Sequence, residues 1–138
     1  MKYEELSEKM IGCAYRVYNK MGYGFLESVY EKCLLIELHK AGLRAESQKS
    51  ITVYYDGENV GDFVADIVVE DTIIVELKSV KQLTTAHEVQ VVNYLTATGK
   101  EVGLLLNFGE RKVEVKRKVR SLTEEFRQDE QDEQDKEE

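Results

Sequence analysis

The spacing of apolar residues changes from helical to strand-like and back along this chain, and this change limits the folds that it can adopt. Helical spacing is found over residues 4–21, 26–40 and 84–98. Strand spacing is found over residues 51–55, 62–69, 72–78, 102–108 and 111–119. Glycines follow each predicted helix, and Asp56-Gly57 is typical of a hairpin turn between the first two strands. The pattern therefore predicts a chain that mixes helices with a sheet.

The order of these segments narrows the topology further. Residues 72–78 are apolar on both faces of the predicted strand, which is typical of a central strand covered on two sides. Without the first helix and the last strand, the order is helix, three strands, helix, strand. A three-strand meander followed by a helical crossover predicts an α/β domain with a mixed central sheet flanked by helices.

Length and composition favour one globular domain. The chain has 138 residues, of which 42% are hydrophobic and 33% are charged, so it is neither wholly disordered nor fibrous. No apolar stretch approaches the roughly 18 residues needed to cross a bilayer, and the first residues lack the apolar core of a signal peptide. Cys13 and Cys33 are too few for a four-thiolate metal site. We therefore expect a reduced, cytoplasmic setting and no membrane partner.

Acidic residues are concentrated at the end of the chain. Residues 123–138 hold 9 acidic and 2 basic side chains, whereas the rest holds 18 acidic and 17 basic side chains. We expect residues 1–120 to form the folded domain and residues 121–138 to form an acidic, disordered tail. A balanced domain can gather positive charge on one face, so the net charge of −8 does not exclude nucleic acid.

Three charged residues lie inside apolar strand segments. Glu76 and Lys78 share one face of the predicted central strand, and Asp66 interrupts the apolar run of the preceding strand. A tight turn between the two strands would bring Asp66 close to Glu76, where two carboxylates repel unless a proton or a cation lies between them. A hard divalent cation such as Mg²⁺ prefers such oxygen ligands. Alternatively, Glu76 forms a salt bridge with Lys78 and Asp66 is paired elsewhere.

Several segments together resemble a known family. Asp66, nine intervening residues and then Glu76-Leu77-Lys78 resemble the core signature of the PD-(D/E)XK nuclease superfamily. Residues 24–30, GFLESVY, match the motif that names the GxxExxY proteins, a branch assigned to that superfamily. Residues 87–94 and 103–109 resemble its later helix and strand. The resemblance covers about residues 6–119 and implies a restriction-endonuclease-like αβββαβ core.

The resemblance also implies a metal-dependent phosphodiesterase site. Asp66 and Glu76 would be the principal metal ligands, with Glu27 as a further carboxylate. Lys78 would orient or activate the attacking water and neutralise charge in the transition state. One departure is that Ala65 stands where the family pattern has a proline. The implied cofactor is Mg²⁺ or Mn²⁺.

The predicted helix 84–98 contributes a polar face. Gln90 and Tyr94 match the QxxxY motif of the RecB-like and lambda-exonuclease-like branches, where these residues help to hold the site and the substrate. His87 lies on the same face, where a hydrogen-bonding or phosphate-binding role is favoured over metal ligation. A polar stripe of this kind can also be a solvated face. Glu27, at a helix start, can likewise simply favour the helix dipole.

The last predicted strand is basic. Lys112, Lys116 and Lys118 share one face with Arg120 and would form a ridge that contacts phosphates. The same lysines can instead protect an edge strand from aggregation.

These observations favour a Mg²⁺-dependent nuclease. Its expected partner is nucleic acid, and we expect this nucleic acid to be DNA. The alternative is a catalytically inactive nucleic-acid-binding or assembly module on the same fold. The sequence leaves the oligomeric state open, including a homodimer.

Overall fold

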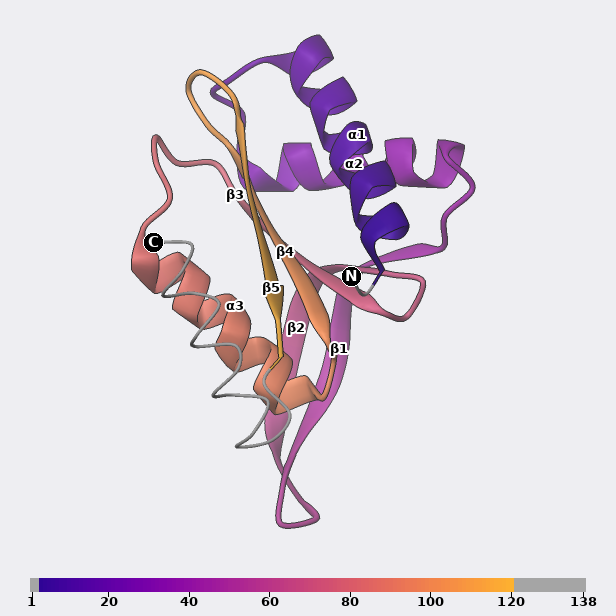
Figure 1. Ribbon diagram of the computed structural model, residues 1–138, viewed down its shortest axis with the longest axis vertical. Helices are drawn as coiled ribbons and strands as arrows, with labels where there is room; N and C mark the ends of the chain where they lie inside the picture. Colours follow the sequence, from indigo (N-terminus) through magenta and orange to yellow (C-terminus); the bar gives the residue numbers. More distant parts are fainter. Residues whose placement is uncertain (1–2, 121–138) are drawn as a thin grey trace.

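The computed structural model describes residues 3–120 and contains every predicted helix and strand (Figure 1). The elements in chain order are α1 (Glu4–Met21), α2 (Glu27–Lys40), β1 (Ala45–Tyr55), β2 (Glu58–Val69), β3 (Ile73–Lys78), α3 (Thr85–Thr98), β4 (Val102–Phe108) and β5 (Val113–Val119). The expected acidic tail, residues 121–138, lies outside the described residues. None of the described helices is long and apolar enough to cross a membrane.

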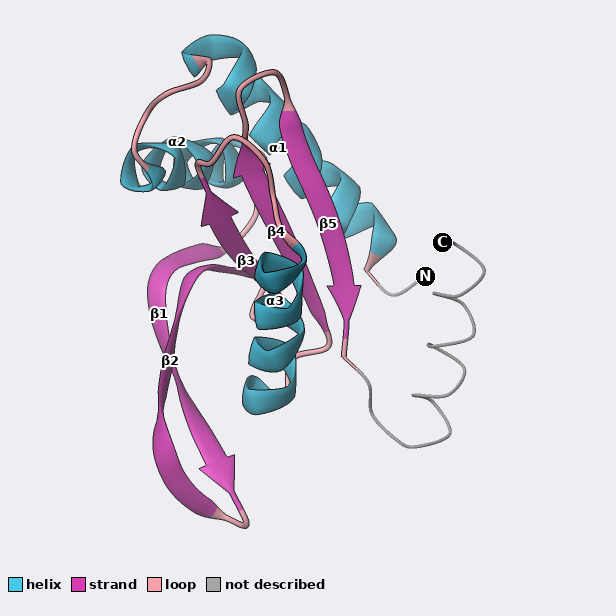
Figure 2. Ribbon diagram, turned by 90° about the vertical axis from the view of Figure 1, so that its left-hand side faces the viewer, coloured by secondary structure: helices cyan, strands magenta, loops and turns pink. Residues whose placement is uncertain are grey.

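The five strands form one mixed sheet in the order β1-β2-β3-β4-β5. Neighbouring strands are antiparallel, except that β3 and β4 are parallel. A parallel pair needs a crossover connection, and α3 supplies it. Helix α3 lies on one face of the sheet, and α1 and α2 lie on the other (Figure 2). The predicted α/β fold with a mixed sheet flanked by helices is therefore confirmed.

The two faces of the sheet are packed very differently. The face under α1 and α2 carries the larger core, which includes fully buried Tyr30, Leu104 and Phe108. The rings of Tyr30 and Phe108 stack with centroids 4.3 Å apart. The face under α3 carries a small core made of Ala65, Val68, Ile74 and Leu95, with a few partly buried neighbours. Most of the burial that stabilises this fold is therefore on the α1/α2 side.

Gly103 lets α3 approach the sheet closely. A Cβ atom at this position would lie 2.9 Å from Val91 Cγ1 and 3.3 Å from Leu95 Cδ2, closer than ordinary packing allows. Both contacts are with α3, so the missing side chain on β4 sets the distance between helix and sheet.

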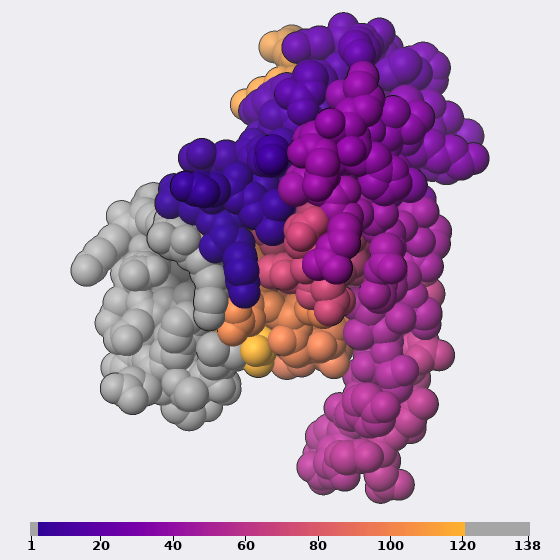
Figure 3. Space-filling view, turned by 90° about the vertical axis from the view of Figure 1, so that its right-hand side faces the viewer, coloured from indigo at the N-terminus to yellow at the C-terminus, as the bar shows by residue number. Residues whose placement is uncertain are grey.

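The β1–β2 hairpin is longer than the sequence predicts and projects from the body as a narrow arm (Figure 3). Its turn has positive φ angles at Asp56 and Gly57, 50° and 79°, as expected for this residue pair. Tyr54 and Tyr55 near the turn are 64% and 70% exposed. The outer part of the arm, residues 53–62, therefore adds strand length without adding to either core.

Candidate active site

Asp66 and Glu76 meet at adjacent positions of β2 and β3. The last paired residues of these strands are Ile67 and Val75, so Asp66 and Glu76 stand one step beyond them. The Asp66 backbone N–H donates to Glu76 Oε2 at 3.2 Å, and the Leu77 N–H donates to Asp66 Oδ2 at 2.8 Å. Each carboxylate therefore binds the backbone of the other's strand, and the predicted proximity of the two residues is confirmed.

The surroundings of the Glu76 carboxyl group disfavour its negatively charged form. Burial, together with the negative charge of Asp66, raises its pKa to about 7. The hydrogen bond from Asp66 N and the charge of Lys78 offset only part of this rise. The charge of Glu27 adds to the rise. The site thus holds more negative charge than its own cation balances.

Lys78 lies two residues after Glu76, on the same face and at the end of β3. Its side chain is half-buried, and it has no hydrogen-bond or ion-pair partner among residues 3–120. The alternative of a direct Glu76–Lys78 salt bridge is therefore wrong, although the Lys78 charge still acts on Glu76. An ammonium group left without a partner beside two carboxylates is available to a ligand.

Helix α2 carries two further carboxylates whose charges act on this region. Glu27 is its first residue and is exposed, and Glu31 lies one turn later. Burial raises the pKa of Glu31, and the charges of Asp66 and Glu27 raise it further. Glu31 also accepts a hydrogen bond from Gln48 Nε2 at 2.8 Å. The sequence prediction missed Glu31, although its i+4 spacing from Glu27 placed it on the same helix face.

The expected three-carboxylate metal site is not formed as such. Among residues 3–120, no group of three or more His, Cys, Asp or Glu side chains is close enough to hold one ion. Asp66 and Glu76 are close, but Glu27 acts on them only through its charge. The backbone hydrogen bonds of Asp66 and Glu76 fix their carboxyl groups on the strands, whereas Glu27 stands exposed on a separate helix.

Helix α3 brings Tyr94 to the same face of the sheet. The Tyr94 ring stacks on Phe63 of β2, with centroids 4.0 Å apart. Burial raises the Tyr94 pKa, as do the charges of Glu76 and Asp66, whereas a hydrogen bond with Gln90 lowers it. The interpretation of this stripe as a purely solvated face is therefore wrong for Tyr94. Gln90 is exposed beside it.

His87 has a role in the start of α3. The Thr84 N–H donates to His87 Nδ1 at 3.1 Å, and the His87 N–H donates to Thr84 Oγ1 at 3.4 Å. These reciprocal bonds form a capping box. The structure thus gives His87 a local partner, and its predicted contact with nucleic acid stays a prediction.

Two residues that the prediction did not assign to the site fix the loop after Lys78. Asn107, which is fully buried, accepts from Val80 N at 2.9 Å and donates to Val80 O at 2.8 Å. It also donates to Glu114 Oε1 at 2.8 Å, and the same oxygen accepts from Leu83 N at 3.2 Å. A buried asparagine at the end of a strand was the available signal, because it needs such partners.

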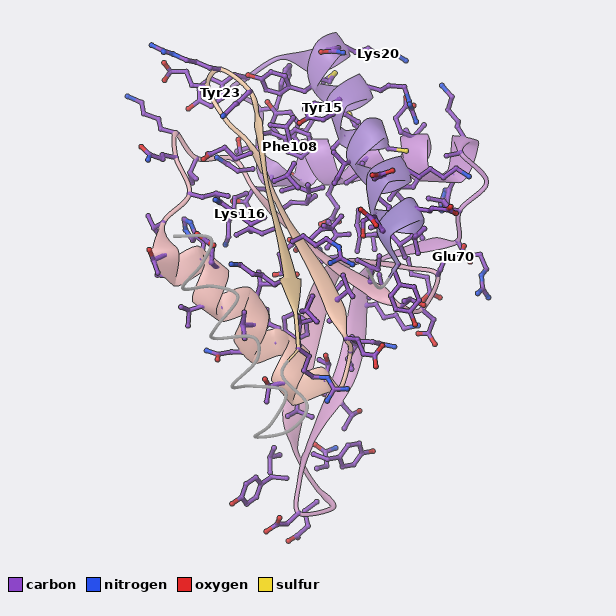
Figure 4. The ribbon with its side chains drawn as sticks, in the orientation of Figure 1. Tyr15, Lys20, Tyr23, Glu70, Phe108 and Lys116 are labelled. Atoms are coloured by element: carbon purple, nitrogen blue, oxygen red, sulfur yellow. The ribbon has the colours of Figure 1, made fainter. Side chains whose placement is uncertain are left out.

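The basic residues of β5 do not form one uniform ridge. Lys118 pairs with Glu88 of α3, with Nζ and Oε1 2.8 Å apart. Lys116 is exposed on the α3 side of β5 (Figure 4). The strand register places it in one row with Leu105 and Glu76. Lys112 is exposed in the turn before β5. Lys116 and Lys112 therefore remain available to a ligand, and Lys118 is engaged within the fold.

Comparisons with solved structures concern the fold. The crystal structure of SSO0001 has a TM-score of 0.54 and 16% identity, covering 93% of this chain and 67% of that one. At this identity the likeness concerns the fold alone. An alkaline exonuclease from Laribacter hongkongensis has a TM-score of 0.40 and 15% identity, covering 83% and 82% of the two chains. That likeness is too weak to carry an argument.

Sequence comparisons give the family. No curated protein sequence matches this chain significantly. The sequence profile of the PD-(D/E)XK nuclease superfamily matches residues 4–118, nearly all of the described chain. The chain therefore belongs to the PD-(D/E)XK nuclease superfamily.

Proposed function

We propose that this protein is a nuclease that cleaves phosphodiester bonds of DNA with the help of Mg²⁺ or Mn²⁺, and that it belongs to the GxxExxY branch of its superfamily. The observation that carries the proposal is the reciprocal Asp66–Glu76 arrangement beside an unpaired Lys78. A merely structural pair of carboxylates would be expected to have a cation as its partner, as buried charges usually do.

The donor set fits a hard divalent cation. Asp66 and Glu76 offer carboxylate oxygens, and each uses only one of its two oxygens in the hydrogen bonds described above. These two residues would hold the ion, and Glu27 would join them by a change of its exposed side chain. When bound, a divalent cation supplies a Lewis acid that neutralises the phosphate and lowers the pKa of water.

The other site residues have separate tasks. The Lys78 ammonium would bind a non-bridging phosphate oxygen or orient the attacking water, because it is half-buried and lacks a partner. Tyr94 and Gln90 would position the substrate from α3, and Lys116 and Lys112 would contact phosphates further along the strand.

The alternative is a nucleic-acid-binding or assembly module that has lost its activity. A complete set of Glu27, Asp66, Glu76 and Lys78 speaks against this alternative, because an inactive copy has no need to keep all four.

Activity assays separate these functions. Purified protein is incubated with single-stranded, double-stranded and branched DNA and with RNA, in Mg²⁺ or Mn²⁺ and in EDTA. We expect metal-dependent cleavage, and Lys78→Ala should lower its rate on the order of 100-fold or more. Lys81→Ala is the matched control, since this lysine is exposed in the following loop. Binding without cleavage of any substrate by the wild type would favour the inactive module.

Metal binding has a readout of its own. Millimolar Mg²⁺ or Mn²⁺ should raise the melting temperature of the wild type, because a ligand of the folded state stabilises it by mass action. Asp66→Asn should abolish that rise, whereas Asp62→Asn, in the exposed arm, should retain it. A melting temperature that does not respond to either metal would contradict the proposed metal site.

A further inference from the structure

The loop between α1 and α2 is free of charge and unusually apolar. Residues 22–26 (GYGFL) form this loop and contain no charged side chain, although a third of the chain is charged. Leu26 is 74% exposed, and Phe25 and Tyr23 are each 41% exposed. Water-exposed apolar side chains that are clustered in one loop, rather than scattered, indicate a contact surface.

The backbone of this loop is nevertheless anchored to the Tyr30 hydroxyl. The Tyr30 hydroxyl donates to Gly22 O and accepts from Phe25 N, the latter at 3.3 Å. The glycines at positions 22 and 24 have φ angles of 76° and 111°, which other residues rarely adopt. The exposure of Phe25 and Leu26 is thus a consequence of a defined loop conformation.

The Phe25 ring is supported from inside the molecule. It meets the Tyr30 ring edge to face, with centroids 6.0 Å apart and an angle of 90° between the planes. Tyr30 in turn stacks on the buried Phe108. A ring that is held by a buried aromatic pair, yet remains 41% exposed, is pre-organised for contact with another flat group.

The loop borders the candidate active site. Ser79, the residue after Lys78, donates from its hydroxyl to Phe25 O at 2.8 Å. Glu27, whose charge acts on Glu76, directly follows Leu26. Tyr23 lies at the same end of the molecule as the β4–β5 turn (Figure 4). The apolar surface therefore adjoins the residues that would handle the phosphate.

We propose that Phe25 and Leu26 form a stacking platform for an unpaired nucleobase next to the scissile phosphate, so that the site takes single-stranded or frayed nucleic acid. This inference rests on the proposed nuclease function. A nucleobase offers a flat π face at the distance of one sugar from the phosphate, and aromatic side chains stack on such faces without regard to sequence. In a duplex these faces are covered by neighbouring bases. The substrate class is thus one with accessible base faces.

The arm is a less suitable surface for the same ligand. Its exposed Tyr54 and Tyr55 are accompanied by Asp56, Glu58 and Asp62, and no basic residue occurs between Lys49 and Lys78. Such a surface repels phosphates. The loop between α1 and α2 contains no acidic residue of its own.

Binding is measured in the Asp66→Asn background, in which cleavage is removed. The probes are a short single-stranded DNA that carries 2-aminopurine and the same DNA in a blunt duplex. Phe25→Ala should weaken binding of the single strand about 10-fold and reduce the quenching of 2-aminopurine, because one stacking contact is lost. Duplex binding should change less than twofold.

Two further variants guard against an effect on folding. Leu26→Asn removes an apolar side chain at the N-cap of α2, a position where asparagine stabilises a helix, and it should weaken single-strand binding without lowering the melting temperature. Ile36→Ala is the matched control, because Ile36 is 58% exposed on the same helix about 15 Å further along its axis. It should leave single-strand binding unchanged.

The outcomes distinguish this inference from the proposed function. Equal loss of single-strand and duplex binding in Phe25→Ala, or no loss of either, would overturn the platform while leaving wild-type cleavage as evidence for the nuclease. Selective loss of single-strand binding in Phe25→Ala, together with a wild-type protein that cleaves nothing, would support the platform and contradict the nuclease. Wild-type protein that neither binds nor cleaves would overturn both.

Discussion

Two glutamates on opposite sides of the central sheet differ in their surroundings. Glu37 is buried and Glu76 is partly buried. Glu37, on α2, is 8% exposed and is surrounded by Arg16, Lys20 and Lys40, whose nitrogens lie 3.2 to 3.6 Å from its oxygens. Burial raises its pKa, but the hydrogen bond from Arg16 and the two lysine charges more than offset this, so that its pKa is lowered. The pKa of Glu76, beside Asp66, is instead raised to about 7.

This difference between the two glutamates suggests that one side of the sheet stabilises the fold and the other side binds a ligand. On the α1/α2 side, an acidic side chain is neutralised by cations of the same fold and lies above a large apolar core. On the α3 side, the apolar core is small and the carboxylates are left with each other. Charges that the fold does not balance are the ones available to a ligand.

The largest effect should come from the apolar side. Phe108→Ala removes a fully buried ring that stacks on Tyr30, and it should lower the free energy of unfolding by about 3–5 kcal/mol. Val89→Ala, at a position on α3 that is 52% exposed, should change it by less than about 0.5 kcal/mol. Denaturant titration measures both. A loss below about 1 kcal/mol for Phe108→Ala would break the assignment of stability to this side.

The second effect is a pH dependence of opposite sign for the two carboxylates. Because the folded protein raises the Glu76 pKa above 4.5, stability from its protonated form is full below pH 4.5 and is lost as the pH rises to about 7. In EDTA, Glu76→Gln should therefore be more stable than the wild type by about 1–3 kcal/mol at pH 8, and this gain should vanish near pH 4.

Glu37 serves as the counterpart in the same experiment. Its lowered pKa means that the stability it contributes is present above pH 4.5 and is lost as the pH falls through the folded-state value. Glu37→Gln should therefore be less stable than the wild type at pH 7, by an amount that shrinks in acid. If both variants changed the stability in the same direction at each pH, the proposed contrast between Glu37 and Glu76 would be wrong.

The third prediction tests how closely α3 is packed. Gly103→Ala places a methyl group against Val91 Cγ1 and should cost about 1–3 kcal/mol of stability. Combining it with Val91→Ala should cost less than the sum of the single changes, because the same contact is relieved. Strict additivity in this double-mutant cycle would show that α3 moves away instead.

The smallest effect concerns the basic strand. Lys116→Ala should reduce the slope of log binding constant against log salt concentration by about one unit, since one phosphate contact is lost. Lys118→Ala should reduce it by less, because Lys118 is already paired with Glu88. Fluorescence titrations of DNA at several salt concentrations give both slopes. Equal slopes for the two variants would contradict the division of β5 into engaged and available lysines.

The apolar pattern was sufficient to predict the helices, the strands and the sheet type. It underestimated β1, which begins at Ala45 rather than near Ile51, because the residues from Glu46 to Ser50 are polar and lie on an edge strand. Asp66 and Glu76 could be placed together because a tight turn fixes the register of their strands. Glu31 and the loop contacts of Asn107 could not, since they depend on how separate elements pack.

The anchoring of the loop after Lys78 has a consequence for the time at which the site appears during synthesis. Val80 and Leu83 are fixed by side chains 27 and 31 positions later, on β4 and β5. Amide exchange at these two residues should accordingly be as slow as in β4, and fast exchange there would show that the loop is independent of it. A growing chain therefore contains its two carboxylates and its lysine before it contains the side chains that fix the loop beside them. The site becomes complete only when the last hairpin has been translated.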